Sequence, residues 1–150
     1  MRIIEITLVL AISALIAGYA IPSFTNSRTK QEALFTMAQI EQAVQYAKTI
    51  TTPDTHIYLC ASSDNKTCSP FPARYFIMTT KTKKLLLTYP KLQYGLLQFK
   101  PSDKHNNILS ITSKITSTPG TFKYTPNNNN VQLQRELVTN NNARVYIDKS

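Results

Sequence analysis

The chain has 150 residues, of which 42% are hydrophobic and 17% are charged, so it has room for one domain with a packed core and an appendage. Three glycines exclude a glycine-rich phosphate loop, and two cysteines with two histidines are too few for most zinc modules. The net charge of +9 lies mainly after residue 52, where thirteen Lys and Arg against five Asp and Glu leave +8. We therefore expect a protein that is not an enzyme and needs no cofactor or metal, and whose basic part contacts polyanions or simply aids solubility.

Residues 6–22, ITLVLAISALIAGYAIP, form an uncharged segment near the N-terminus. As a helix rising about 1.5 Å per residue, this segment covers about 25 Å, the short limit for a membrane span. Three interpretations compete. It is a secretory signal cleaved after Ala20, which would leave a secreted binding or hydrolytic domain starting near Ile21. It is a permanent anchor, or it is a membrane helix that later leaves the bilayer to pack against copies of itself.

Glu5 favours the third interpretation, because a signal peptide gains nothing from an acid at the edge of its apolar segment. A buried, unpaired carboxylate is costly there, so Glu5 needs a cation. Pairing with Arg2, one helical turn earlier, would satisfy Glu5 without any function. A cation on another subunit would instead give Glu5 a role in assembly.

The helical pattern continues beyond the apolar segment with an amphipathic stripe at spacings of four and three residues. The apolar positions are Ala33, Met37, Ile40, Val44 and Ala47, and the opposite face carries Lys30, Gln31, Glu32, Gln39, Gln42 and Gln45. Pro53 should end the helix near residue 50, and Pro22 should interrupt, kink or locally loosen it. We expect residues 1–26 to form a transmembrane or filament-core helix and residues 27–52 its amphipathic half.

Residues 53–150 should form a β domain, because short β-rich runs alternate with turn signals there. The predicted strands lie at 55–60, 74–79, 83–89, 96–100, 108–112, 121–125, 131–138 and 143–147. Eight short strands at this spacing favour an antiparallel sheet or a small sandwich. The fold class is therefore α+β, with a long N-terminal helix packed on a small antiparallel β-sheet domain.

Cys60 and Cys68 flank a short segment in which Asp64-Asn65 is a natural turn. They form either a redox or metal pair or a structural disulfide. The disulfide is favoured, since two cysteines with two histidines are too few ligands for most metal modules. It would stabilise the domain by about 2–3 kcal/mol and place it in an oxidising compartment.

Residues 3–12, IIEITLVLAI, followed by Pro22-Ser23-Phe24, resemble the N-terminal segment of type IV pilins and type II secretion pseudopilins. Glu5 and Pro22 stand where mature members of that superfamily have an acid and a proline. Leu59-Cys60 after the long helix, and the closing segment at residues 137–146, resemble the GspH/FimT family of minor pilins and pseudopilins. The resemblance implies a pilin-like fold and a minor subunit that initiates a type IV pilus or lies at its tip. The alternative is a minor pseudopilin of a type II secretion system.

The resemblance also implies a location and partners. The chain would span the inner membrane once with its C-terminal domain in the periplasm, and would be extracellular within a pilus. Its partners would be other pilin or pseudopilin subunits, the assembly machinery and membrane lipid. Glu5 would pair with the α-amino group of Met1 on a neighbouring subunit, and Pro22 would permit local unwinding. Arg2 is unusual for the superfamily, and no leader ending in glycine precedes Met1, so we expect either a processed form or an omitted leader.

Family members implicated in DNA uptake carry Gly-Arg-x-Arg near the C-terminus. Here Ala143 replaces the glycine and Tyr146 the second arginine, so Arg144 alone matches. Arg144 could hold a phosphate and Tyr146 could stack on an unpaired base, with Arg135 and Lys149 widening the patch. We favour an ordinary edge strand with solvated charges, and a surface that binds double-stranded DNA during uptake is the alternative.

The densest basic cluster is Lys81-Thr82-Lys83-Lys84, which precedes three leucines at 85–87. We favour a solvated turn before a buried strand over a phosphate-binding site for this cluster.

Overall fold

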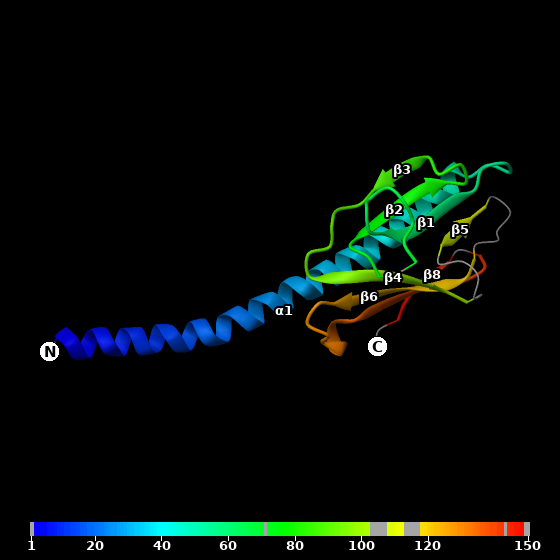
Figure 1. Cartoon of the computed structure of the whole chain (residues 1–150). Coiled ribbons are helices and arrows are strands. Elements are labelled where there is room, and N and C mark those ends of the chain that lie inside the picture. Colours follow the sequence, from blue (N-terminus) through cyan, green and yellow to red (C-terminus); the bar gives the residue numbers. More distant parts are fainter. Residues whose placement is uncertain (1, 71, 103–107, 113–117, 143, 149–150) are drawn as a thin grey trace.

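The computed structural model describes residues 2–70, 72–102, 108–112, 118–142 and 144–148. Its main feature is helix α1 (Arg2–Ile50), whose first part projects alone and whose second part lies against a β domain (Figure 1). The helix ends where the sequence predicts, since Thr51 donates a last helical hydrogen bond to Ala47 and Pro53 follows two residues later.

The domain-facing side of α1 is the predicted amphipathic stripe. All five of its apolar members, Ala33, Met37, Ile40, Val44 and Ala47, are at most 1% exposed. Thr29 and Thr36 are also buried, and their hydroxyls donate to the carbonyls one turn earlier. The helix therefore buries one continuous face without leaving these two hydroxyls unsatisfied.

Pro22 does not interrupt α1, which continues through it. A proline inside a helix removes one backbone hydrogen bond, and Figure 1 shows a gentle bend in the blue part of the helix. The prediction of an interruption is wrong for the isolated chain. Local unwinding at Pro22 stays a prediction for an assembled filament.

The β domain contains two four-stranded antiparallel sheets that lie beside the helix (Figure 1). Sheet A has the order β3-β2-β1-β5 and is built from β1 (Ile57–Ser62), β2 (Tyr75–Thr80), β3 (Leu85–Thr88) and β5 (Leu109–Ile111). Sheet B has the order β4-β6-β7-β8 and is built from β4 (Gly95–Pro101), β6 (Gly120–Pro126), β7 (Arg135–Thr139) and β8 (Val145–Asp148). All eight predicted strands are present, and the predicted α+β class is confirmed.

The two sheets and the helix share one hydrophobic core. Phe76 of sheet A meets Phe122 of sheet B edge to face, with ring centroids 5.8 Å apart. Phe99 packs on Phe122 from the neighbouring strand β4 at 4.6 Å. Alternation explains these positions, because every second residue is buried throughout β6 and in β4 from Gly95 to Phe99.

Two strand boundaries differ from the predictions for local reasons. Residues Val131–Leu133 form a short 3-10 helix whose first turn is capped by Asn130, so β7 begins only at Arg135. Lys83 has a left-handed backbone (φ 62°), so the third strand begins at Leu85. That strand lies at the edge of sheet A, and Leu85 and Leu87 are each 40% exposed rather than buried.

Candidate assembly helix and nucleic-acid surface

The first part of α1 is strongly apolar and fully exposed. An 18-residue window has a mean hydropathy of 2.1, and none of it is buried. Exposed large side chains include Ile3, Ile4, Leu8, Val9, Leu15, Ile16 and Ile21. An apolar surface this continuous requires lipid or another apolar surface as its partner, which is consistent with a membrane anchor.

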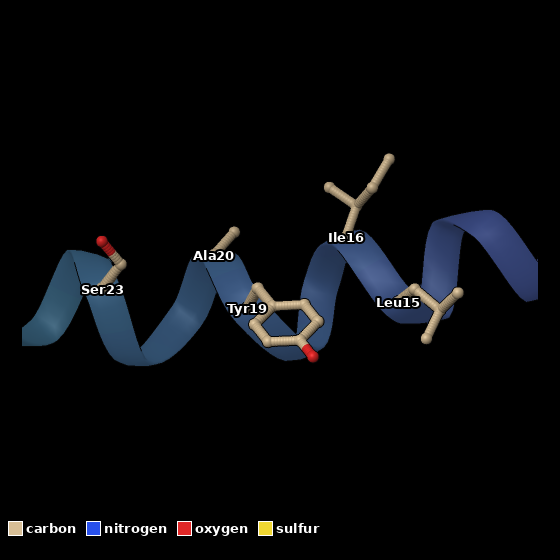
Figure 2. Close-up of a pocket in the computed structure, with 5 residues that line it drawn as sticks. All are labelled: Leu15, Ile16, Tyr19, Ala20 and Ser23. Atoms are coloured by element: carbon tan, nitrogen blue, oxygen red, sulfur yellow. The ribbon is translucent and has the colours of Figure 1, made fainter.

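A shallow open hollow lies on this part of the helix, lined by Leu15, Ile16, Tyr19, Ala20 and Ser23 (Figure 2). Figure 2 shows the short side chains of Ala20 and Ser23 beside the larger Ile16 and Tyr19. Small residues of this kind let the backbone of another helix approach closely. The surface is therefore suited to packing against a helix as well as against lipid.

Glu5 lies in the first turn of α1 and is exposed. Among the described residues, Glu5 makes no ion pair with Arg2, although the two residues are one turn apart. The ion pair in the described part of the chain joins Lys123 to Glu136, in sheet B, at 2.8 Å. The intrahelical explanation of Glu5 therefore has no support in the structure. Met1, its expected partner on a neighbouring subunit, lies outside the described residues.

Glu32, which lies opposite the predicted apolar stripe in the sequence pattern, makes hydrogen bonds that connect the helix to the β domain. Its carboxylate accepts hydrogen bonds from the amides of Gln93 (2.7 Å) and Tyr94 (3.0 Å) and from the Tyr124 hydroxyl (2.9 Å). Burial and the neighbouring Glu32 carboxylate raise the pKa of Tyr124 above its ordinary value of 10. The carboxylate thus joins α1, the segment before β4, and β6.

Further contacts surround Glu32 and attach the start of the domain to the helix. Arg28 donates to the Tyr94 hydroxyl at 3.2 Å and lies 4.3 Å from the centre of the Phe24 ring. Asn128 donates to the Asn26 side chain at 3.2 Å. No local motif marks the contacts of Arg28 with Tyr94 and of Asn26 with Asn128, because these partners lie more than sixty positions apart in the chain.

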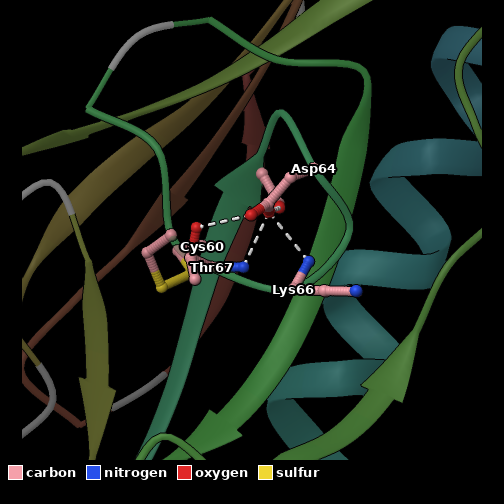
Figure 3. The surroundings of a disulfide bond; sticks show 6 residues. Cys60, Asp64, Lys66 and Thr67 are labelled. Atoms are coloured by element: carbon pink, nitrogen blue, oxygen red, sulfur yellow. Dashed lines mark hydrogen bonds between the residues drawn. A yellow bond between two sulfur atoms is a disulfide. The ribbon is translucent and has the colours of Figure 1, made fainter.

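The predicted disulfide between Cys60 and Cys68 is present and closes the loop after β1 (Figure 3). The predicted turn is also present, since Asn65 has a left-handed backbone (φ 62°), which asparagine tolerates. Asp64 organises the loop by accepting hydrogen bonds from the amides of Lys66 (2.9 Å) and Thr67 (2.8 Å). These backbone hydrogen bonds hold the pKa of Asp64 well below its ordinary value, because they favour the ionised carboxylate.

Arg144 and Tyr146 are both exposed at the C-terminal edge of sheet B. The Asn140 side chain accepts a 2.8 Å hydrogen bond from the Arg144 amide, and the Asn140 amide donates to the Arg144 carbonyl at 3.1 Å. The turn between β7 and β8 therefore fixes the backbone that carries Arg144. Tyr146, two residues on, pairs with the exposed Val138 of β7.

Arg135 does not lie beside Arg144 in the structure. It begins β7, whereas Thr139 at the other end of β7 pairs with Val145 next to Arg144, so about 13 Å of strand separates the two ends. The Arg135 guanidinium also donates to the carbonyls of Gln132 and Gln134. Lys149, the fourth predicted contact, lies outside the described residues.

Comparisons with known proteins give a likeness in structure alone. No protein-family model and no curated protein matches the chain. Two solved structures of the minor pseudopilin EpsH from the type II secretion system of Vibrio cholerae resemble it, with TM-scores of 0.57 and 0.56 at 13% and 11% identity. Each match covers 79% of this chain and 97% of the EpsH chain. The chain therefore has the pilin-like fold of a minor pseudopilin.

Proposed function

We propose that the protein is a minor pilin-like structural subunit that joins a filament, either a type IV pilus or a type II secretion pseudopilus. The observation that carries this proposal is the wholly exposed apolar half of α1, attached without a break to a folded β domain. Signal cleavage after Ala20 would instead cut inside this continuous helix, which favours a retained apolar half.

In this proposal the apolar half of α1 occupies two environments in turn. It first lies in the inner membrane as a single span, with the β domain in the periplasm. The assembly machinery then extracts the subunit, and the same surface packs against the helices of other subunits. The apolar area stays out of water in both states, so the exchange costs little hydrophobic free energy. Within a pilus the domain becomes extracellular.

Glu5 sets the axial position of the subunit in the proposed filament. A carboxylate among apolar helices requires a cation, and the α-amino group of Met1 on a neighbouring subunit would supply it. Only one offset between the two helices neutralises both charges. The absence of a Glu5–Arg2 ion pair within the described structure leaves the Glu5 carboxylate available for this partner.

The test is incorporation of Glu5→Ala into filaments sheared from cells of the source organism. We expect the variant to insert into the membrane normally but to be missing from the filaments. Glu41→Ala is the matched control, because it removes the same charge from an exposed position on the same helix. Equal incorporation of both variants would contradict the assembly role of Glu5.

DNA binding by the C-terminal edge of sheet B is a second candidate function, favoured by the fixed and exposed Arg144 and by the 55% exposed Tyr146 beside it. An arginine on a rigid turn makes charge-assisted bonds to phosphate with little loss of conformational entropy. This function would favour a pilus that takes up DNA during natural transformation over a secretion pseudopilus.

Binding of duplex DNA by the full-length protein in non-ionic detergent, titrated with salt, tests this second function. We expect binding to persist near about 0.15 M salt and to weaken markedly in Arg144→Ala. Lys30→Gln, which removes one charge from the exposed face of α1, should leave it nearly unchanged. Binding that disappears with modest salt, or weakens equally in both variants, would contradict a dedicated DNA surface.

A further inference from the structure

A pocket of about 340 Å³ lies on the face of sheet A that is turned away from α1. Tyr58 of β1 and Thr79 of β2 pair with each other in its lining, and both alternate with residues that point into the core. The disulfide loop closes one side of the pocket through Lys66, and the connection between β2 and β3 closes another through Lys81 and Lys83. The pocket is thus framed by two separately stabilised turns.

Three lysines line this pocket. Within the described part of the chain, none of Lys66, Lys81 and Lys83 forms an ion pair. Asp64 of the same loop carries a negative charge, but Ser62, Thr67 and the loop amides hold its carboxylate, and it forms no ion pair with these lysines among the described residues. Three ammonium groups around one cavity repel one another and produce a positive potential that favours an anion.

The backbone at Lys83 is unusual for a residue with a side chain. Its φ of 62° lies in the left-handed region, which glycine adopts without steric cost. The turn enforces this conformation, because Lys83 donates to the Thr80 carbonyl and the Thr80 amide donates to the Lys84 carbonyl, both at 2.9 Å. A glycine would fold more easily at this position but would place no charge at the pocket.

The pocket lies far from the part of the helix suited to lipid. The amide of Lys81 donates to the carbonyl of His56, in the segment that follows the end of α1. Residues 22–50 of α1 span about 42 Å, so a headgroup of the membrane that holds the apolar segment is out of reach. Figure 1 agrees, since the connection from β2 to β3 lies toward the end of the domain away from the N-terminus.

We propose that this pocket binds a phosphate group, either as inorganic phosphate or as a phosphodiester of nucleic acid. Its ammonium groups and the hydroxyls of Tyr58 and Thr79 are donors of the kind that several phosphate oxygens require. Arg144 is not among the residues that line this site, and one subunit supplies its whole lining. It combines Lys81 and Lys83 of the connection between β2 and β3 with Lys66, which the disulfide loop brings to it.

The first experiment titrates the full-length protein in non-ionic detergent with inorganic phosphate at constant ionic strength, following the amide NMR signals of the two turns. We expect saturable shifts, and a weakening of about tenfold or more in Lys83→Gly and in Lys66→Gln. Lys100→Gln is the matched control, because it removes one charge from an exposed position on sheet B. Absence of saturable binding, or equal weakening by Lys100→Gln, would overturn the proposal.

Duplex DNA in a parallel titration distinguishes the two sources of phosphate. If the ligand is a phosphodiester, DNA binding weakens in Lys83→Gly and inorganic phosphate competes with it. If the ligand is free phosphate, the phosphate titration responds to the pocket variants while DNA binding does not. Lys83→Gly should also unfold at the same temperature as the wild type or higher, so loss of binding cannot be attributed to loss of folding; Lys66→Gln tests the pocket independently.

Discussion

The Glu32 carboxylate in α1 accepts a 2.9 Å hydrogen bond from the Tyr124 hydroxyl in β6, ninety-two positions later in the chain. The same carboxylate holds the amides of Gln93 and Tyr94, which immediately precede β4. A single charged group therefore connects the helix to sheet B at the end of the domain nearest the apolar half of α1. Hydrogen bonds to a charged group are stronger than those between neutral groups, so these three bonds should contribute substantially to the stability of the domain.

Replacement of Glu32 by alanine should lower the free energy of unfolding of the β domain by about 2–3 kcal/mol, because it leaves three donors without their acceptor. Tyr124→Phe removes one of the three hydrogen bonds and should cost about 1 kcal/mol. The double variant should lose less than the sum of the two single losses, because both changes remove the same contact. Urea unfolding followed by the near-ultraviolet circular dichroism of the tyrosines measures these effects. Strict additivity would contradict a direct Glu32–Tyr124 interaction.

Gly95→Ala should displace Tyr124 from this contact. A methyl group at Gly95 would overlap the Tyr124 ring, which is fully buried and is held by its hydrogen bond to Glu32. We expect a loss of about 2–3 kcal/mol in the same urea measurement. Gly18→Ala is the control, since a methyl group there has no atom within 4 Å and should leave the domain unchanged.

Asp64 should make the domain sensitive to acid. Its pKa is depressed by the hydrogen bonds of the disulfide loop, so the stabilisation is full above the ordinary carboxyl pKa of 3.8 and is lost as the pH falls toward the folded-state value. Asp64→Asn should flatten the fall in stability between about pH 4 and pH 2. Asp54→Asn, a change at an exposed carboxyl, serves as the control. Parallel slopes for wild type and Asp64→Asn would show that the loop does not hold the carboxylate.

Reduction of the Cys60–Cys68 disulfide should cost about 2–3 kcal/mol, the contribution that chain entropy gives to a loop of this length. Urea midpoints with and without a phosphine reductant measure the loss. The variant with alanine at both positions should not respond to the reductant. A response in that variant would mean that the reductant acts elsewhere in the protein.

The helix and the strands were largely predictable, because their signals are local. The spacing of Ala33, Met37 and Ile40 identified the buried face of α1, and alternating residues identified β4 and β6. The start of β7 was missed because Asn130 caps a short 3-10 helix where the composition alone favours a strand. The prediction that Leu85 and Leu87 are buried was wrong, because β3 lies at the edge of sheet A and leaves them exposed. The edge position follows from the strand order, which no local sequence pattern records.

The candidate functional residues were likewise predictable only where the signal is local in the sequence. Glu5, Pro22 and the cysteine pair could be identified from the sequence, because each is marked by its immediate neighbours. Glu5 and Pro22 border the uncharged apolar segment, and the two cysteines flank a turn. The role of Glu32 was not predictable, since a lone acid on the polar face of an amphipathic helix gives no sign of partners at residues 93, 94 and 124. The separation of Arg135 from Arg144 likewise depends on strand pairing rather than on composition.

The continuity of α1 has a mechanical consequence. The helix passes from its apolar half into the core of the domain without a linker, and Asn26, Arg28 and Glu32 fasten the domain where the two parts meet. A force applied to the apolar half therefore acts along the helix axis and loads these contacts and the buried helix face in shear. The domain cannot swivel relative to the helix, so the orientation of the helix fixes the direction in which Arg144 and the lysine-lined pocket face.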